Sequence, residues 1–322
     1  MKIGKSLKKL KGDASLRTFF RNKKKNSSSI IVYANKNKRS NLLIYDSINQ
    51  ILLKNNILAP KLLSENYSKN YIEIEDFGDQ TIFNLLKKSR TNKLVIFKRI
   101  IRLLNKLQLI RQRKIKNFKK KNYKIPNYHP KILLEEAKLF SDWYIDPYLV
   151  KSKKSIFKKK FIKVVKNLIK KLHYKNDTFV HRDFHVSNLM MFKNRYGVID
   201  TQDAVVGNKS YDLASLIDDV RFKTSTKLKK QVFEFYVNIN KNELNLRKFK
   251  NDFDILSVLR NLKIIGIFTR LAKRDRKYNY LKFIPYTWKL IELRISDNFL
   301  LKDLKNFLDK NFSKKIRNNN GN

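Results

Sequence analysis

Three polar side chains within residues 179 to 212 have the types and the spacing that magnesium-dependent phosphoryl transfer requires. Asp183 and Asn188 fit the catalytic-loop pattern H-R-D-x-x-x-x-N, and Asp200 follows after two short apolar runs. This chemistry needs a carboxylate that orients and deprotonates the attacking hydroxyl, and oxygen ligands that hold Mg²⁺ on the nucleotide phosphates. We therefore expect Asp183 to be the catalytic carboxylate, and Asn188 and Asp200 to be the metal ligands.

An Asp or Asn in a loop more often caps a helix or forms an Asx turn, and each residue alone favours that interpretation. The neighbouring sequence favours a site. Residues 178 to 180 are predicted to form a strand that leads into the loop, and the runs LMMF and YGVI predict a hairpin around residues 193 to 195. The hairpin would return Asp200 to the loop, whose shape His181 and Arg182 are expected to maintain.

The elements that must position this segment are mainly strands in the first part of the chain and mainly helices in the rest. Short strands are predicted at 16 to 20, 29 to 34 and 71 to 79, with one helix at 42 to 56. Beyond residue 80 the apolar spacing is mostly helical, and residues 111 to 130 are interpreted as an exposed basic linker. The expected helices are 81 to 110 with a break near 89 to 92, 131 to 145, 154 to 172, 211 to 221, 225 to 239, 252 to 273 and 286 to 312.

These patterns predict an α+β fold with two lobes. A small β-rich lobe at 1 to 77 would bind the nucleotide, and a larger helical lobe at 78 to 312 would carry the catalytic and substrate residues. A hinge is expected at residues 76 to 79. The polar tail at 313 to 322 is predicted to be disordered.

The amino-acid composition limits the classes of metal site and binding partner that the protein can have. The 322 residues contain no cysteine and four histidines, which excludes disulfides and argues against a structural zinc site. The formal net charge is +47, but the lysines are spread along the chain among many Asn and Ile residues. We interpret the charge as compositional bias, and keep a nucleic-acid-associated protein as the alternative. No apolar run approaches the length of a membrane span, so we expect a cytoplasmic monomer without a membrane partner.

Three longer motifs resemble a known family. HRDFHVSNLM, GVIDTQDAVVGNKSYDLASLIDD and RNLKIIGIFTRLAKRDRKYNYLKFIP are similar to the aminoglycoside phosphotransferase-like branch of the protein-kinase-like fold. Within it they resemble bacterial kinases that phosphorylate N-acetylmuramate and N-acetylglucosamine at C1 in cell-wall recycling. The resemblance implies a kinase with ATP and Mg²⁺ as cofactors and a small amino sugar as acceptor. An aminoglycoside or another small molecule is the alternative acceptor.

The resemblance also implies further roles. Gly12, Asp13, Ala14 and Ser15 match the turn over the nucleotide phosphates, although an ordinary hairpin turn is an equal alternative. Asp76 and Gly78 match the hinge that meets adenine, with a plain strand exit as the alternative. Asp212 matches a buried carboxylate that braces the catalytic loop. The acceptor would be lined by residues whose alternative is core or solvated helix: Trp143, Tyr144, Arg260, Arg270, Arg274 and Asp275.

One expected feature of kinases is missing. A protein kinase carries a strand lysine that pairs with a helix glutamate. Here Tyr33 lies near the lysine position, only Lys36 or Lys38 might substitute, and residues 41 to 64 contain no glutamate. A nucleotide-binding protein without catalysis is therefore a third hypothesis.

Overall fold

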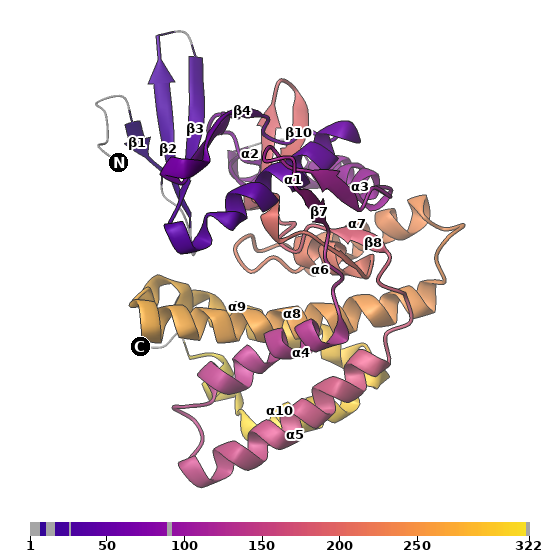
Figure 1. The fold of residues 1–322 in the computed structure, drawn as a ribbon. Coiled ribbons are helices and arrows are strands. Elements are labelled where there is room, and N and C mark those ends of the chain that lie inside the picture. Colours follow the sequence, from indigo (N-terminus) through magenta and orange to yellow (C-terminus); the bar gives the residue numbers. More distant parts are fainter. Residues whose placement is uncertain (1–6, 11–16, 26, 89–91, 320–322) are drawn as a thin grey trace. The chain divides into compact units, whose positions relative to one another are not determined.

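The computed structural model describes residues 7–10, 17–25, 27–88 and 92–319 (Figure 1). The chain forms two compact units. Unit 1 comprises residues 1–126 and 178–206, and unit 2 comprises residues 127–177 and 207–322. The segment that carries Asp183 thus groups with the N-terminal sheet, whereas we expected it within the C-terminal lobe. The assignment of nucleotide and substrate binding to separate lobes stays a prediction.

Unit 1 is built on a five-stranded antiparallel sheet in the order β1-β2-β3-β5-β4. Its strands are β1 (Leu7–Lys9), β2 (Arg17–Lys24), β3 (Ser27–Ala34), β4 (Leu62–Asn66) and β5 (Tyr71–Glu75). Apolar residues alternate with polar ones along β5, and Val32 of β3 lies opposite Ile72. Helix α1 (Ser40–Lys54) adds Leu42 and Tyr45 to the same buried cluster. The predicted strands and helix are confirmed, apart from their exact ends.

The expected linker at 111 to 130 is wrong for part of its length. Strands β6 (Lys114–Lys116) and β7 (Asn122–Lys124) form an antiparallel hairpin instead. Ile115 and Ile125 are buried, and the backbone N–H of Phe118 donates to Asp46 of α1. The apolar residues in this lysine-rich stretch therefore anchor it. Helices α2 (Ile82–Lys88) and α3 (Lys93–Gln108) precede it.

The segment around Asp183 contains β8 (Thr178–Val180), β9 (Leu189–Phe192), β10 (Arg195–Val198) and β11 (Val205–Gly207). The expected hairpin is confirmed, with β9 antiparallel to β10. Lys193 and Asn194 both have positive φ, which is the conformation of a two-residue type I′ turn. Bridges from Thr81 to Met190 and from Leu58 to Gly197 attach the hairpin to the rest of unit 1.

Unit 2 is helical, and the long helix α8 (Leu246–Asp275) is its centre (Figure 1). It packs against α4, α6 and α9. A π-helical turn, Phe140–Tyr144, follows α4. The other helices are α4 (Pro130–Leu139), α5 (Lys151–Lys170), α6 (Ser210–Ile217), α7 (Thr226–Ile239), α9 (Ile284–Ser296), α10 (Lys302–Asn311) and α11 (Lys314–Arg317).

Two expectations about the C-terminal part need correction. The helix predicted at 286 to 312 is two helices, because Asn298 breaks it and caps the next turn. Residues 313 to 319 of the expected disordered tail are ordered. Helix α11 begins at the Ser313 cap, and Arg317 binds Glu292 and Asp309 at 2.8 and 2.6 Å. Residues 320 to 322 lie outside the described part.

A buried ionic cluster joins four helices of unit 2. Asp218, at the end of α6, accepts hydrogen bonds from Arg294 of α9 at 2.8 and 2.9 Å and from Ser257 of α8 at 2.6 Å. Lys229 of α7 lies 3.2 Å from the same carboxylate. Burial alone would raise the pKa of Asp218, but the charges of Arg294 and Lys229 outweigh it and lower that pKa to about 2.

We predict that Asp218→Asn lowers the free energy of unfolding by about 3 to 5 kcal/mol at pH 7, because it leaves two buried cations without their anion. A carboxylate whose folded pKa is depressed stabilises the fold above its unfolded pKa. That stabilisation should disappear as the pH falls from about 4 to about 2. Urea unfolding across this pH range measures it. Glu234→Gln removes the exposed Lys230 pair and should change stability by less than about 0.5 kcal/mol; an equal loss in both variants would contradict the assignment.

A close helix crossing in unit 2 depends on Gly266. A Cβ at this position of α8 would lie 2.3 Å from the carbonyl carbon and 2.4 Å from the carbonyl oxygen of Leu139, at the end of α4. Backbone atoms cannot move aside as a flexible side chain can.

We expect Gly266→Ala to destabilise the protein by about 1 to 3 kcal/mol or more, despite the better helix propensity of alanine. Thermal unfolding provides the measurement. Lys248→Ala, at an exposed position of the same helix, is the control and should have an effect within about 0.5 kcal/mol. A stabilised Gly266→Ala variant would show that α4 and α8 do not approach this closely.

Candidate active site

The loop after β8 holds Asp183 in a fixed backbone. The carbonyl oxygen of Asp183 accepts hydrogen bonds from the His185 N–H and from the Asn188 side-chain amide, both at 3.0 Å. Phe184 and Val186 are buried on either side of His185 and anchor the loop in the core. The Asp183 side chain is half-buried. The loop thus ties Asp183 to Asn188, as their spacing predicted, although the roles of both residues stay predictions.

Ile199 connects the hairpin to this loop through both of its backbone groups. Its N–H donates to the carbonyl oxygen of Asn188 at 3.1 Å, and its carbonyl lies 3.1 Å from Nε2 of the fully buried His181. Asp200 follows directly, so it lies next to Asn188 in space as well as next to Ile199 in sequence. His181 therefore contacts the residue that precedes Asp200, and its role in maintaining the loop stays a prediction.

Outside the hairpin turn at Lys193 and Asn194, two further residues of this segment have a left-handed backbone that is unusual outside glycine. Arg182 has a φ of 73° and Asp200 a φ of 62°. The surroundings hold both. The Arg182 guanidinium donates to the carbonyl oxygen of Asp203 at 3.4 Å, and Thr201 after Asp200 is buried and bonded to Asn49 of α1 at 2.6 Å. Such conformations persist where the fold enforces them, which is commonest at functional sites.

The donor set around Asp200 suits Mg²⁺. The amide nitrogen of Asn188 is bonded to Asp183, and its oxygen accepts no hydrogen bond from the residues that the structure describes, so a neutral oxygen is available there. The Asp200 side chain is 36% exposed and supplies the anionic oxygen. Across the described ranges, no three His, Cys, Asp or Glu side chains form a metal-binding group. One carboxylate and one amide, completed by water and phosphate oxygens, is a magnesium set rather than a zinc set.

The expected hinge is a tightly bonded turn. Asp76 accepts from Ser28 at 2.7 Å, from the Gly78 N–H at 2.8 Å and from Nη2 of Arg21 in β2 at 3.1 Å. Burial would raise the pKa of Asp76, but these donors together lower it below its usual range. Gly78 has a φ of 75°, which only glycine adopts readily. The Gly78 N–H is thus already bonded, and any contact of this turn with adenine stays a prediction.

The sequence interpretation missed Arg17 of β2. Its guanidinium contacts Asp200 Oδ1 and the side-chain oxygen of Gln202, both at 2.6 Å. The expected phosphate turn at Gly12, Asp13, Ala14 and Ser15 lies outside the described residues. Arg17 follows it after one intervening residue, and strand alternation places Arg17 on the same side of β2 as Phe19 and Arg21. This alternation was the available signal for Arg17 in the sequence.

The residues expected around the acceptor all belong to unit 2 and differ in exposure. Tyr144 is a correction: its ring is buried among Phe140, Trp288 and Phe312, so it offers no open surface to a sugar. Trp143, next to it, is half-buried. Asp212 is fully buried at the start of α6, and its bracing of the loop stays a prediction.

The four expected charged residues of α8 form two groups. Arg274 and Asp275 are bonded to each other at 2.7 and 3.0 Å. Arg260 is only 5% exposed, and its Nη1 has no hydrogen-bond partner within the described part of the chain. The same holds for Nε of Arg270. Buried donors without a partner are rare, so Arg260 and Arg270 are the better candidates for ligand contact.

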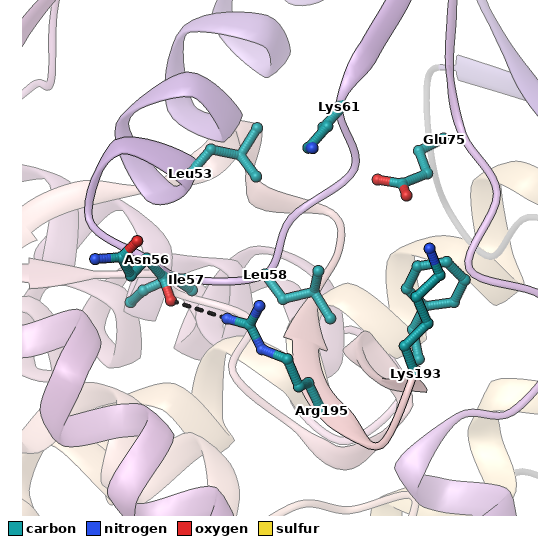
Figure 2. A pocket seen from close by; sticks show the side chains of 9 residues that line it. Leu53, Asn56, Ile57, Leu58, Lys61, Glu75, Lys193 and Arg195 are labelled. Atoms are coloured by element: carbon teal, nitrogen blue, oxygen red, sulfur yellow. Dashed lines mark hydrogen bonds between the residues drawn. The ribbon is translucent and has the colours of Figure 1, made fainter.

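A separate hollow of about 250 Å³ opens elsewhere in unit 1 (Figure 2). Figure 2 shows Lys61, Lys193 and Arg195 around it, with Glu75 as its acidic residue. Arg195 donates to the carbonyl oxygen of Asn56 at 3.3 Å. None of the expected site residues lines this hollow, so we do not assign the catalytic chemistry to it.

Comparison with known proteins agrees with the resemblance in the motifs. Residues 6 to 246 match the phosphotransferase enzyme family. A relative named N-acetylmuramate/N-acetylglucosamine kinase, from Pseudomonas aeruginosa, is 24% identical over 92% of this chain and 86% of its own. A relative of the same name from Neisseria meningitidis is 27% identical over 85% of this chain and 80% of its own.

Solved structures share the fold at low identity. The gentamicin complex of APH(2″)-IIa matches with a TM-score of 0.62 and 15% identity, covering 89% of this chain and 93% of its own. An ethanolamine kinase from Plasmodium vivax matches with a TM-score of 0.59 and 13% identity, covering 90% and 82%. These neighbours confirm the expected kinase-like α+β fold. The chain therefore belongs to the phosphotransferase enzyme family and is a kinase that acts on a hydroxyl group.

Proposed function

We propose that this kinase transfers the γ-phosphate of ATP to the anomeric hydroxyl of an amino sugar, N-acetylmuramate or N-acetylglucosamine, with Mg²⁺ as cofactor. The choice of acceptor rests on the similarity to relatives named N-acetylmuramate/N-acetylglucosamine kinase, which extends along at least 85% of the chain. Structural neighbours with other acceptors are only 12 to 15% identical, and they support the fold alone. Aminoglycoside phosphotransferases among the structural neighbours were solved with ADP or ATP bound, which supports the choice of nucleotide.

The arrangement in unit 1 supports the mechanism. Asp183 accepts the proton of the C1 hydroxyl as that oxygen attacks the γ-phosphorus in line. The new bond joins the sugar oxygen to phosphorus, the bond to the β-phosphate oxygen breaks, and ADP leaves. Asn188 and Asp200 would hold a Mg²⁺ ion, and such an ion would offset the charge of the phosphate oxygens. Little covalent chemistry is required of the protein beyond this positioning.

Asp183→Asn should lower kcat by about 100-fold or more, because an amide cannot accept the proton. Asp200→Ala should abolish turnover through loss of the anionic metal ligand. Asp183→Asn should unfold thermally within a few degrees of the parent protein, since Asp183 is only half-buried. Asp200→Ala should stay folded but be less stable, because it removes the carboxylate beside the buried Arg17. A coupled assay for ADP release measures kcat. Glu65→Gln, which alters an exposed acid of the same unit bonded to Lys119, is the control and should keep full activity.

Substantial activity in Asp183→Asn or Asp200→Ala would refute the assignment of these roles. Loss of activity in Glu65→Gln as well would show that the assay responds to any change of charge in unit 1.

The acceptor is tested with Mg-ATP and a panel of N-acetylmuramate, N-acetylglucosamine, its methyl glycoside, gentamicin, choline and ethanolamine. Mass spectrometry identifies which compound gains a phosphate. We expect phosphorylation of the two free sugars and none of the methyl glycoside, because its anomeric oxygen carries no proton. A phosphorylated methyl glycoside would exclude C1 as the site, and phosphate on gentamicin or choline alone would exclude an amino-sugar acceptor.

A further inference from the structure

We propose that Arg17 is the phosphate-binding cation of this kinase, in place of the strand lysine that protein kinases use. The inference deepens the proposed function and rests on its assignment of Asp200 to the metal. The lysine of protein kinases would lie near Tyr33 on β3. Arg17 lies on the neighbouring strand β2, where Thr18 pairs with Tyr33.

The contacts of Arg17 place its charge at the candidate metal site. Its guanidinium lies 2.6 Å from Asp200 Oδ1, and no other basic side chain in the described part of the chain forms an ion pair with Asp200. Ligands of one small cation lie beside one another. Phosphate oxygens that share a metal ion with Asp200 would therefore come within reach of a group bonded to Asp200. Arginine suits this place because its planar fork binds phosphate and carboxylate alike.

Two aromatic rings contact the Arg17 guanidinium. In a protein kinase, a helix glutamate positions the strand lysine instead. The Arg17 guanidinium carbon lies 5.4 Å from the ring centre of Phe19 and 5.4 Å from that of Tyr45 on α1. Burial raises the pKa of Tyr45 to about 12, so the ring stays neutral. Cation–π contact holds Arg17 without neutralising it, which explains how the site operates although residues 41 to 64 lack glutamate.

If Arg17 had only a structural role, we would expect its contacts to resemble those of the neighbouring Arg21. Arg21 is as buried as Arg17, but it is bonded to two carboxylates, Asp76 and Asp79, at 2.7 Å each. Arg17 contacts the carboxylate of Asp200 and the side-chain oxygen of Gln202. The carboxylate that Arg17 contacts is thus the group expected to bind a divalent cation. Lys36 and Lys38, the two lysines near the end of β3, are exposed in the turn before α1.

Nucleotide binding without acceptor tests the inference. Dissociation constants of ADP and of adenosine are measured by calorimetry or ligand-observed NMR, with Mg²⁺ and in EDTA, for the parent protein, Arg17→Ala, Arg17→Gln and Arg17→Lys. We expect Arg17→Ala and Arg17→Gln to weaken ADP binding by about 10-fold to 100-fold. Adenosine, which has no phosphate, should bind within about twofold of the parent value. Arg17→Lys should retain most of the ADP affinity, because lysine binds phosphate as a point charge.

Arg99→Ala is the matched control. Arg99 also stacks on a tyrosine of unit 1, with 4.3 Å to the Tyr196 ring centre, and donates to the carbonyl of Asn194. Its removal should leave ADP binding within about twofold. If Arg17→Ala fails to fold, Arg17→Gln and Arg17→Lys decide the question alone.

Three outcomes would overturn the inference. ADP affinity unchanged in both neutral variants would show that Arg17 does not reach the phosphates. Equal losses for ADP and adenosine would make Arg17 a structural residue. A loss confined to the Mg²⁺ experiments would show that it acts only through Asp200. Each leaves the proposed function standing if phosphate transfer occurs, whereas no ADP binding by the parent protein would overturn both.

Discussion

The site depends on one residue that contributes only its backbone. Ile199 donates to Asn188 and accepts from His181, at 3.1 Å in each case, and these two bonds join the end of the hairpin to the loop. Asp200 takes its left-handed turn directly afterwards. Without this connection, Asp183 and Asn188 would belong to one loop and Asp200 to another. With it, the proposed base and the two proposed oxygen ligands lie in a single short segment, as phosphoryl transfer requires.

Carboxylates are scarce in this chain, and the described structure uses them in pairs with cations. The sequence has 27 acidic against 74 basic residues. Asp218 is enclosed by Arg294 and Lys229, and Asp76 is bonded to Arg21. A buried carboxylate without partners would be costly, and in these two cases a cation lies beside it. The cation beside Asp200 is Arg17, which we propose also binds the nucleotide phosphates.

Local patterns in the sequence predicted local structure well and contacts between distant residues poorly. The strand period, the two-residue turn before Arg195 and the helical spacing of α8 follow from neighbouring residues, and the spacing of Asp183 and Asn188 identified the loop. Arg17 contacts Asp200 although the two residues are 183 positions apart in the sequence. The periodicity of neighbouring residues does not predict such a contact. Tyr144 was expected at a surface because aromatic rings suit both sugars and cores, and only the packing around it decides between them.

A crystal structure of the protein with ADP, Mg²⁺ and N-acetylglucosamine would test the central claim most directly. The account predicts Asp200 and Asn188 oxygens on the metal at about 2.1 Å, with the C1 hydroxyl within hydrogen-bonding distance of the Asp183 carboxylate. A metal ion held by other residues would contradict it. So would a sugar whose C1 hydroxyl points away from Asp183.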